Sequence, residues 1–203
     1  MIEVVIWGLG LVLLAAMLLP WLARRNMRSS RINCSNNLHQ IGIAARTWAL
    51  DNGDRFPSQV SVTNEGAMEF AEKGMAAPVF EVMSNELSNP KILICPWDAH
   101  RTSLAVFSNF NNSHLSYFIS ADADQDRPQM FLAGDRNLTT NGSAVPGGGL
   151  CVLQTNMELG WTAQMHKNVG NILLADGSAQ ELVGAQLRAA ARNSGSTNRL
   201  AMP

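Results

Sequence analysis

Two residues near the C-terminal end carry side chains that can do chemistry, an imidazole at His166 and a carboxylate at Asp176. Such a pair can bind a metal ion or act as a general base and acid. Asp176 is followed by Gly177 and lies between two apolar runs, which is a strong signal for a β-hairpin whose glycine has a positive φ. We therefore interpret Asp176 as a turn residue and expect His166 to hydrogen-bond across a sheet, ahead of a metal-binding or catalytic role.

Three alternating carboxylates, Asp122, Asp124 and Asp126, form a candidate cation loop. Such a pattern opens the calcium loop of an EF-hand, which requires glycine at its sixth position and glutamate at its twelfth. Those positions hold Arg127 and Ala133, so the segment is not an EF-hand. A cation loop and a solvated acidic loop remain as interpretations, and we favour the second.

The three cysteines, Cys34, Cys95 and Cys151, show no C-x-x-C spacing, which disfavours a zinc site of the usual kind. The odd count leaves at least one thiol unpaired in a monomer. One disulfide can form in an oxidising compartment. The sequence does not identify the pair, and we retain Cys34 with Cys95 as a candidate.

The signatures of common enzymes are missing from the sequence. There is no G-x-S-x-G or H-E-x-x-H, and the glycines at 147–149 lack the Lys-Ser/Thr of a phosphate-binding loop. Asp135 and Arg136 are expected to form an internal ion pair or a turn. With 15 basic and 16 acidic residues, no global field attracts nucleic acid. We predict neither enzymatic activity nor a nucleic-acid partner.

The elements that position these residues begin with an apolar run from Val4 to Leu22, nineteen residues without a charge. As a helix it spans about 28 Å, close to the thickness of a bilayer. A buried helix of a soluble core is disfavoured by this length. A cleaved secretory signal is disfavoured because nothing basic precedes the run. We predict that residues 1–23 are a transmembrane anchor in the lipid bilayer.

Residues 24–53 are predicted to continue this helix as an amphipathic segment that packs on a domain. Arginines follow the apolar run, at Arg24, Arg25, Arg28 and Arg31. Beyond them apolar residues recur at intervals of three and four, at Leu38, Ile41, Ala45 and Trp48. The turn-forming residues 51–54 then end the helix.

Residues 54–193 are predicted to form a globular head, and residues 194–203 a loose C-terminal tail. We expect helices over 77–87 and 183–192. We expect strands over 91–94, 115–120, 130–133, 150–153, 171–175 and 179–183. Strands that follow a long helix and are joined by hairpins indicate an α+β fold with an antiparallel sheet.

Several patches resemble the prepilin-type processing-associated H-X9-DG domain proteins, a type IV pilin-like and type II secretion pseudopilin-like family. His166 is followed by nine residues and then Asp176-Gly177, which is the spacing of the family's signature. Other patches follow in the family's order: 34–42 (CSNNLHQIG), 51–57 (DNGDRFP), 95–98 (CPWD), 116–118 (SYF) and 134–137 (GDRN).

The resemblance implies a pilin-like fold, with a long N-terminal transmembrane helix packed on a small antiparallel β-sheet head. It implies a membrane-anchored structural subunit of a type II secretion or type IV pilus-like envelope assembly. Such a subunit contacts other pilin-like subunits, or its own copies, through the N-terminal helices. Glu3, seventeen residues before Pro20, matches the glutamate that pairs with a neighbour's terminal amine. Pseudopilin heads sometimes hold calcium, so calcium is the one cofactor considered, at the acidic loop.

The N-terminus departs from the family pattern, because the basic leader, the cleavage-site glycine and the Phe-Thr start are absent. Either the start codon is misplaced, or the anchor is degenerate and unprocessed. Prepilin peptidase is a partner only in the first case. The arginines after the apolar run favour a cytoplasmic head, whereas the resemblance places the head outside. We expect a single-pass inner-membrane protein with an extracytoplasmic head.

Two other functions compete with the structural subunit. One is a membrane-tethered binding module of the cell envelope that does not polymerise. The other, less favoured, is an envelope hydrolase that uses His166 and Asp176.

Overall fold

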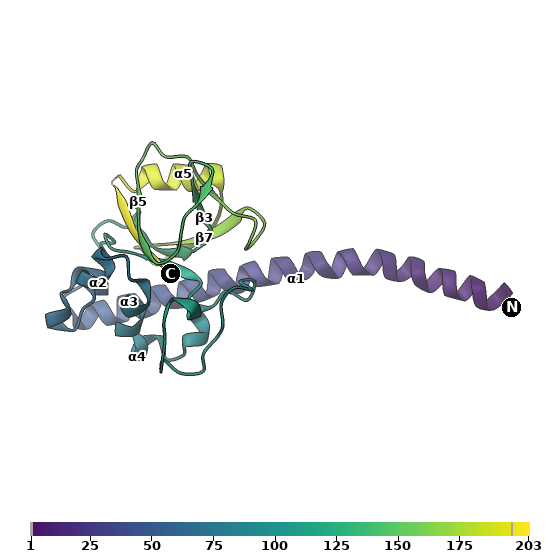
Figure 1. The fold of residues 1–203 in the computed structure, drawn as a ribbon, viewed down its shortest axis with the longest axis horizontal. Helices are drawn as coiled ribbons and strands as arrows, with labels where there is room; N and C mark the ends of the chain where they lie inside the picture. The colour runs from purple at the N-terminus through teal and green to yellow at the C-terminus, as the bar shows by residue number, and fades with distance from the viewer. Residues whose placement is uncertain (1, 196) are drawn as a thin grey trace.

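A long helix and a head packed against its C-terminal half make up this α+β protein (Figure 1). The helix, α1, runs over Ile2–Asp51. The computed structural model describes the backbone of residues 2–195 and 197–203 and the side chains of residues 6–19, 31–195 and 197–203. Figure 1 shows the N-terminal half of α1 extending away from the head, while its C-terminal half lies alongside the head.

The predicted transmembrane anchor over residues 1–23 is wrong. Within the part of the chain that the structure describes, no helix is both long enough and apolar enough to cross a membrane. The transmembrane helix in the predicted fold and the predicted single-pass inner-membrane location are wrong for the same reason.

The C-terminal half of α1 is amphipathic, as its apolar spacing predicts. Leu38, Ile41, Ala45 and Trp48 are all buried, and they pack into the larger of two apolar clusters. The helix ends where the turn residues begin, because the backbone N–H groups of Asn52 and Asp54 both donate to the carbonyl oxygen of Ala49. Burial of this face fixes α1 to the head.

Short helices connect α1 to the sheet: α2 (Met68–Glu72), α3 (Ala76–Val82), α4 (Ser84–Leu87) and the 3₁₀ turns η1 (Pro57–Gln59), η2 (Val62–Asn64), η3 (Pro90–Leu93) and η4 (Asn112–His114). The helix predicted over 77–87 is divided at Met83. The strand predicted over 91–94 is wrong, since that segment overlaps η3. Pro90 sets φ at the first position, and the Asn89 side chain accepts from the N–H of Lys91.

A six-stranded antiparallel sheet forms the middle layer, in the order β5-β9-β1-β2-β7-β8 within the described residues. Its strands are β1 (Tyr117–Ser120), β2 (Phe131–Asp135), β5 (Gly149–Leu153), β7 (Val169–Leu174), β8 (Ala179–Val183) and β9 (Asn198–Met202). A smaller sheet has the order β4-β3-β6, from β3 (Leu138–Thr140), β4 (Ser143–Ala144) and β6 (Leu159–Trp161). The predicted strands over 115–120, 130–133, 150–153, 171–175 and 179–183 are recovered with small shifts.

Side chains alternate across β7, so that both faces of the large sheet are covered. Leu173 belongs to the cluster under α1, and Ile172 and Leu174 belong to the second cluster. The second cluster also contains Leu187 of α5 (Gly184–Asn193), close to the predicted helix over 183–192. The order of layers is therefore α1, sheet, α5 (Figure 1).

The C-terminal segment is not the loose tail predicted for residues 194–203. Strand β9 pairs with β1 on one side and β5 on the other. Leu200, Ala201 and Met202 are buried. An inner strand satisfies its backbone groups on both sides and buries its side chains, which offsets the entropy of ordering the terminus.

Candidate functional site

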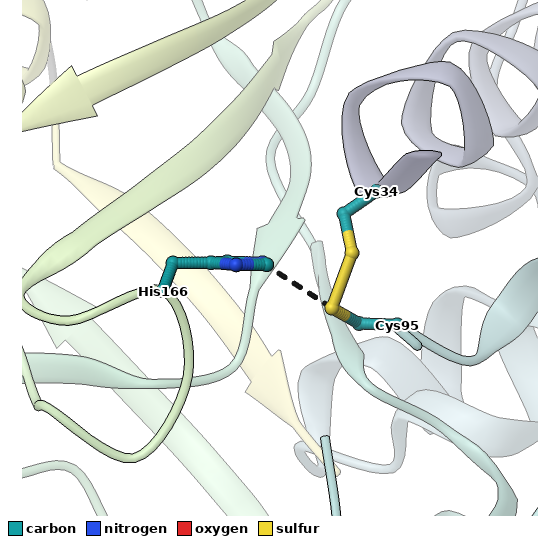
Figure 2. Close-up of side chains that lie close together, drawn as sticks. All are labelled: Cys34, Cys95 and His166. Atoms are coloured by element: carbon teal, nitrogen blue, oxygen red, sulfur yellow. Dashed lines mark hydrogen bonds between the residues drawn. A yellow bond between two sulfur atoms is a disulfide. The ribbon is translucent and has the colours of Figure 1, made fainter. Parts of the chain in front are cut away.

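Three residues from distant parts of the chain meet beneath the sheet (Figure 2). Cys34 lies on α1, Cys95 follows η3, and His166 lies in the loop between β6 and β7. Cys34 and Cys95 form a disulfide with their Cα atoms 5.2 Å apart, which confirms the candidate pair; Cys151 is a free thiol on β5. The disulfide joins α1 to the head.

His166 contacts the disulfide directly. Its Nε2 lies 3.2 Å from Cys95 Sγ, and the residue is only 6% exposed. Its loop has three consecutive residues in the left-handed region, His166, Lys167 and Asn168, with φ of 27°, 54° and 65°. Such conformations cost free energy in residues other than glycine and are concentrated at functional sites. The buried surroundings of His166 therefore maintain a costly loop conformation that places the imidazole against the sulfur.

Asp135, at the end of β2, lies beside the same imidazole. Its Oδ2 is 3.6 Å from His166 Nε2 and accepts hydrogen bonds from the backbone N–H and the side-chain Nδ2 of Asn171, at 2.7 and 2.9 Å. Its Oδ1 is buried and has no hydrogen-bond partner among the described atoms. A buried carboxylate oxygen without a hydrogen-bond partner costs free energy, so the burial of Asp135 requires an explanation.

Burial shifts the two titratable groups in opposite directions. It lowers the pKa of His166 to about 4, with help from the positive charge of Arg31 and against the negative charge of Asp98. It raises the pKa of Asp135 to about 7, against the hydrogen bonds from Asn171. Between these values the imidazole is neutral and the carboxyl is protonated, so the cluster is uncharged.

A buried ion pair lies close by. Arg136 Nε and Nη2 donate to Asp98 Oδ2 and Oδ1, at 2.6 and 2.7 Å, and Asp98 is 4% exposed. Arg136 was expected to be part of an internal ion pair, and its partner here is Asp98. Burial acts to raise the pKa of Asp98, but the bonds and the charge of Arg136 outweigh it and hold that pKa below its usual value.

Asp176 and Gly177 form the predicted hairpin turn between β7 and β8. The backbone N–H of Ser178 donates to Asp176 Oδ1 at 2.8 Å, and Gly177 has a φ of 85°. The turn docks on α1, since Arg46 Nη2 donates to the Ala175 carbonyl and His39 Nδ1 lies 3.2 Å from the Gly177 carbonyl oxygen. The described contacts of Asp176 are thus those of a turn residue, and His166 is engaged with Cys95 and Asp135.

Replacing Gly177 by alanine is expected to lower the free energy of unfolding by about 1–2 kcal/mol, because a Cβ disfavours positive φ. A Cβ here meets Arg46 Nε at 3.5 Å, so the cost is conformational rather than steric. Gly177→Asn is expected to cost less, since asparagine tolerates this region. Urea unfolding measures both, with Gly149→Ala as the control, because Gly149 has no positive φ and open space around it. Equal losses in all three variants contradict the prediction.

The acidic loop does not present three free carboxylates. Asp122 Oδ1 accepts from Arg199 Nε at 2.8 Å, and Asp122 Oδ2 accepts from the Arg199 backbone N–H at 2.7 Å. Asp124 Oδ1 accepts from the backbone N–H of Asp126 at 3.0 Å. The loop therefore anchors β9, and this engagement of Asp122 supports the acidic-loop interpretation over a cation loop.

The side chains of Glu3 and Pro20, predicted to act in assembly, lie outside the described residues. Sequence reasoning did not identify Asp135 as a neighbour of His166, nor Asn171 as its hydrogen-bond donor. The GDRN patch at 134–137 is the signal that pointed to this region. Nothing local in the sequence indicates which strand lies beside the histidine loop.

No model of a known protein family, no curated protein and no solved structure matches this chain. The resemblance to the H-X9-DG proteins therefore rests on the motifs quoted above.

Proposed function

We propose that this chain is a pilin-like structural subunit that assembles laterally with its own copies through the N-terminal half of α1. It has no catalytic role in this proposal. The observation that carries the proposal is the exposed apolar surface of residues 6–19. The large apolar side chains there are between 46% and 76% exposed: Ile6, Trp7, Leu9, Leu11, Val12, Leu13, Leu14, Met17, Leu18 and Leu19.

Apolar side chains on all sides of this helical stretch support a packed state in which several neighbours cover it. A helix that is apolar all round is normally buried. The head covers α1 only in its C-terminal half (Figure 1), so the cover for residues 6–19 comes from another molecule. The same stretch of a second copy is a matching partner, because helices of identical composition can pack side by side along their length.

The design of the head supports a structural role. The disulfide ties α1 to the loop after η3, the Asp98–Arg136 pair ties that loop to the end of β2, and the Arg46 hydrogen bond ties α1 to the Asp-Gly hairpin. A subunit that bears load through a protruding helix requires such connections. His166 is buried with its Nε2 against Cys95 Sγ, which favours a structural over a catalytic histidine.

Replacing Leu11 by glutamate is expected to weaken self-association by at least about 10-fold, because a charge is then buried in an apolar contact. Sedimentation velocity of the full chain over a range of concentrations measures this. Leu50→Glu is the matched control, because Leu50 lies on the same helix and is 73% exposed, against 68% for Leu11.

A photo-reactive amino acid at position 11 provides the second measurement. Cross-links to residues 6–19 of another copy support the proposed packing. A monomeric wild-type chain, or equal weakening by Leu11→Glu and Leu50→Glu, contradicts it.

A further inference from the structure

The cluster around the disulfide contains more potential metal donors than a structural cross-link requires. Cys34 Sγ, Cys95 Sγ and His166 Nε2 all lie within 4.8 Å of one another, and all three residues are buried. A disulfide needs neither an imidazole 3.2 Å from one of its sulfurs nor a strained loop to hold that imidazole. These features have a common explanation if the sulfurs have a second partner.

We propose that, after reduction of the disulfide, Cys34, Cys95 and His166 bind a Zn²⁺ ion and the Asp135 carboxylate completes its coordination. The chain then has two forms in which α1 is cross-linked to the head at this site. One is cross-linked by the disulfide, and the other is cross-linked by the metal.

The donor set fits zinc. Two thiolates, one imidazole and one carboxylate are all ordinary zinc ligands, at about 2.3 Å for sulfur and about 2.0–2.2 Å for nitrogen and oxygen. Mixed sulfur and nitrogen donors also disfavour magnesium and calcium, which prefer oxygen. In a tetrahedral site the two sulfurs lie about 3.8 Å apart. Only breaking the S–S bond allows that separation, so the proposed site exists in the reduced protein alone.

Asp135 supplies the second, independent observation. Its Oδ1 is buried with no described hydrogen-bond partner, while Oδ2 lies 3.6 Å from the same His166 nitrogen that faces the sulfur. The carboxylate is already oriented by Asn171, as carboxylates that bind metals usually are. A cation bound to His166 Nε2 would lie beside Asp135 Oδ2, so this carboxylate is placed to complete the coordination.

Conversion of the disulfide form into the metal-binding form requires an external reductant, such as a dithiol. A dithiol reductant donates two electrons and two protons to the disulfide, which becomes two thiols, and the dithiol is oxidised to its own disulfide. Zn²⁺ then displaces the two thiol protons, which pass to solvent. Removal of the metal and oxidation of the thiols restore the cross-link.

Zinc binding to the full chain tests the proposal. The protein is reduced with a water-soluble phosphine, which takes an oxygen from water to become the phosphine oxide, and is incubated with Zn²⁺ without oxygen. We expect one tightly held Zn²⁺ per reduced chain and none on the oxidised chain. Co²⁺ in place of zinc is expected to show the sulfur-to-metal charge-transfer and tetrahedral ligand-field bands of a thiolate site.

Variants identify the ligands. Cys34→Ser, Cys95→Ser and His166→Gln are each expected to weaken zinc binding by roughly 100-fold or more, because each removes one of four bonds. Asp135→Asn is expected to weaken it and to change the ligand-field bands. Matched controls are Cys151→Ser, His100→Gln and Asp126→Asn, whose side chains lie outside the cluster. Circular dichroism establishes that each variant is folded.

Several results overturn the proposal. They are a folded, reduced chain that binds no Zn²⁺, equal binding by the oxidised chain, and undiminished binding by the Cys34→Ser or His166→Gln variant. Unchanged affinity and spectra in Asp135→Asn remove Asp135 from the coordination.

Discussion

Replacing Arg136 by methionine is expected to lower the free energy of unfolding at pH 7 by about 3–5 kcal/mol, because it leaves a buried carboxylate without its cation. The side chain of Asp98 is fully buried, and Arg136 donates two hydrogen bonds to it. Methionine retains the length and apolar stem of arginine but neither its charge nor its donors. Urea unfolding of both proteins measures the difference.

The pH dependence distinguishes a lost ion pair from a packing defect. The folded-state pKa of Asp98 lies below its ordinary value, so its stabilising contribution is present above that value. The contribution is lost as the pH falls through the lowered pKa. In the Arg136→Met variant burial, the largest influence on this carboxyl, is opposed only by hydrogen bonds such as that from the His100 backbone N–H, so we expect it to raise the pKa of Asp98 and to penalise the variant where the carboxylate is charged. The difference between the two proteins is therefore expected to shrink as the pH falls through the raised pKa of the variant, which lies above the ordinary value of about 4, and to go on shrinking down to the lowered pKa of the wild type.

Arg31→Met is the matched control for this prediction. Arg31 pairs with Glu181 at 3.1 Å, but the two side chains are 30% and 45% exposed. An exposed pair of this kind contributes about 1 kcal/mol or less. The double variant with Asp98→Asn and Arg136→Met, which has no buried charge, is expected to be more stable than Arg136→Met alone. Equal losses in Arg31→Met and Arg136→Met, or a difference independent of pH, contradict the prediction.

Removing the disulfide is expected to lower the free energy of unfolding by about as much as the Arg136→Met substitution does. Cys34 and Cys95 are separated by 61 residues in the chain. Closing a loop of that size stabilises the folded state by about 4 kcal/mol in the chain-entropy treatment. The double variant with Cys34→Ala and Cys95→Ala is expected to lose about this much, because alanine leaves no unpaired thiol or hydroxyl in the core. Thermal or urea unfolding in the presence of a chelator measures it.

Cys151→Ala is the control that distinguishes the effect of losing the cross-link from the effect of replacing a cysteine. Cys151 is a free and half-buried residue on β5, so its replacement is expected to cost well under the value for the disulfide. Reduction of the wild-type chain, with metal chelated, is expected to reproduce the double variant. Addition of Zn²⁺ to the reduced wild type should then restore stability, and addition to the double variant should not. A double variant as stable as the wild type rules out a structural cross-link.

Local patterns in the sequence were sufficient to predict most of the secondary structure around the site. The apolar spacing of residues 38–48 predicts a buried helix face, because helical periodicity is a property of neighbouring residues. The Asp-Gly pair predicts the hairpin between β7 and β8 for the same reason. The α+β class with an antiparallel sheet follows from those elements and their order.

Local sequence patterns gave wrong predictions at both ends of the chain. They predicted a membrane span near the N-terminus and a loose tail at the C-terminus. The run from Val4 to Leu22 has the length expected of a bilayer span, but the described part of the chain contains no helix that could cross a membrane. Residues 194–203 carry few signals of order. They become the inner strand β9 because β1 and β5 offer hydrogen bonds on both sides. Strand pairing of this kind is a long-range contact that no local window contains.

The sequence by itself determined the amphipathic half of α1, five strands of the large sheet, the turn at Asp176-Gly177 and the cysteines available for a cross-link. Only the tertiary structure decided which side chain faces His166. The residue is separated from Cys95 by 71 positions, and it reaches Cys95 and Asp135 through the order of the strands and the strained loop before β7. Burial then sets the pKa directions of both titratable groups. Contacts between distant residues depend on how the elements pack, and residue type and spacing do not specify that packing.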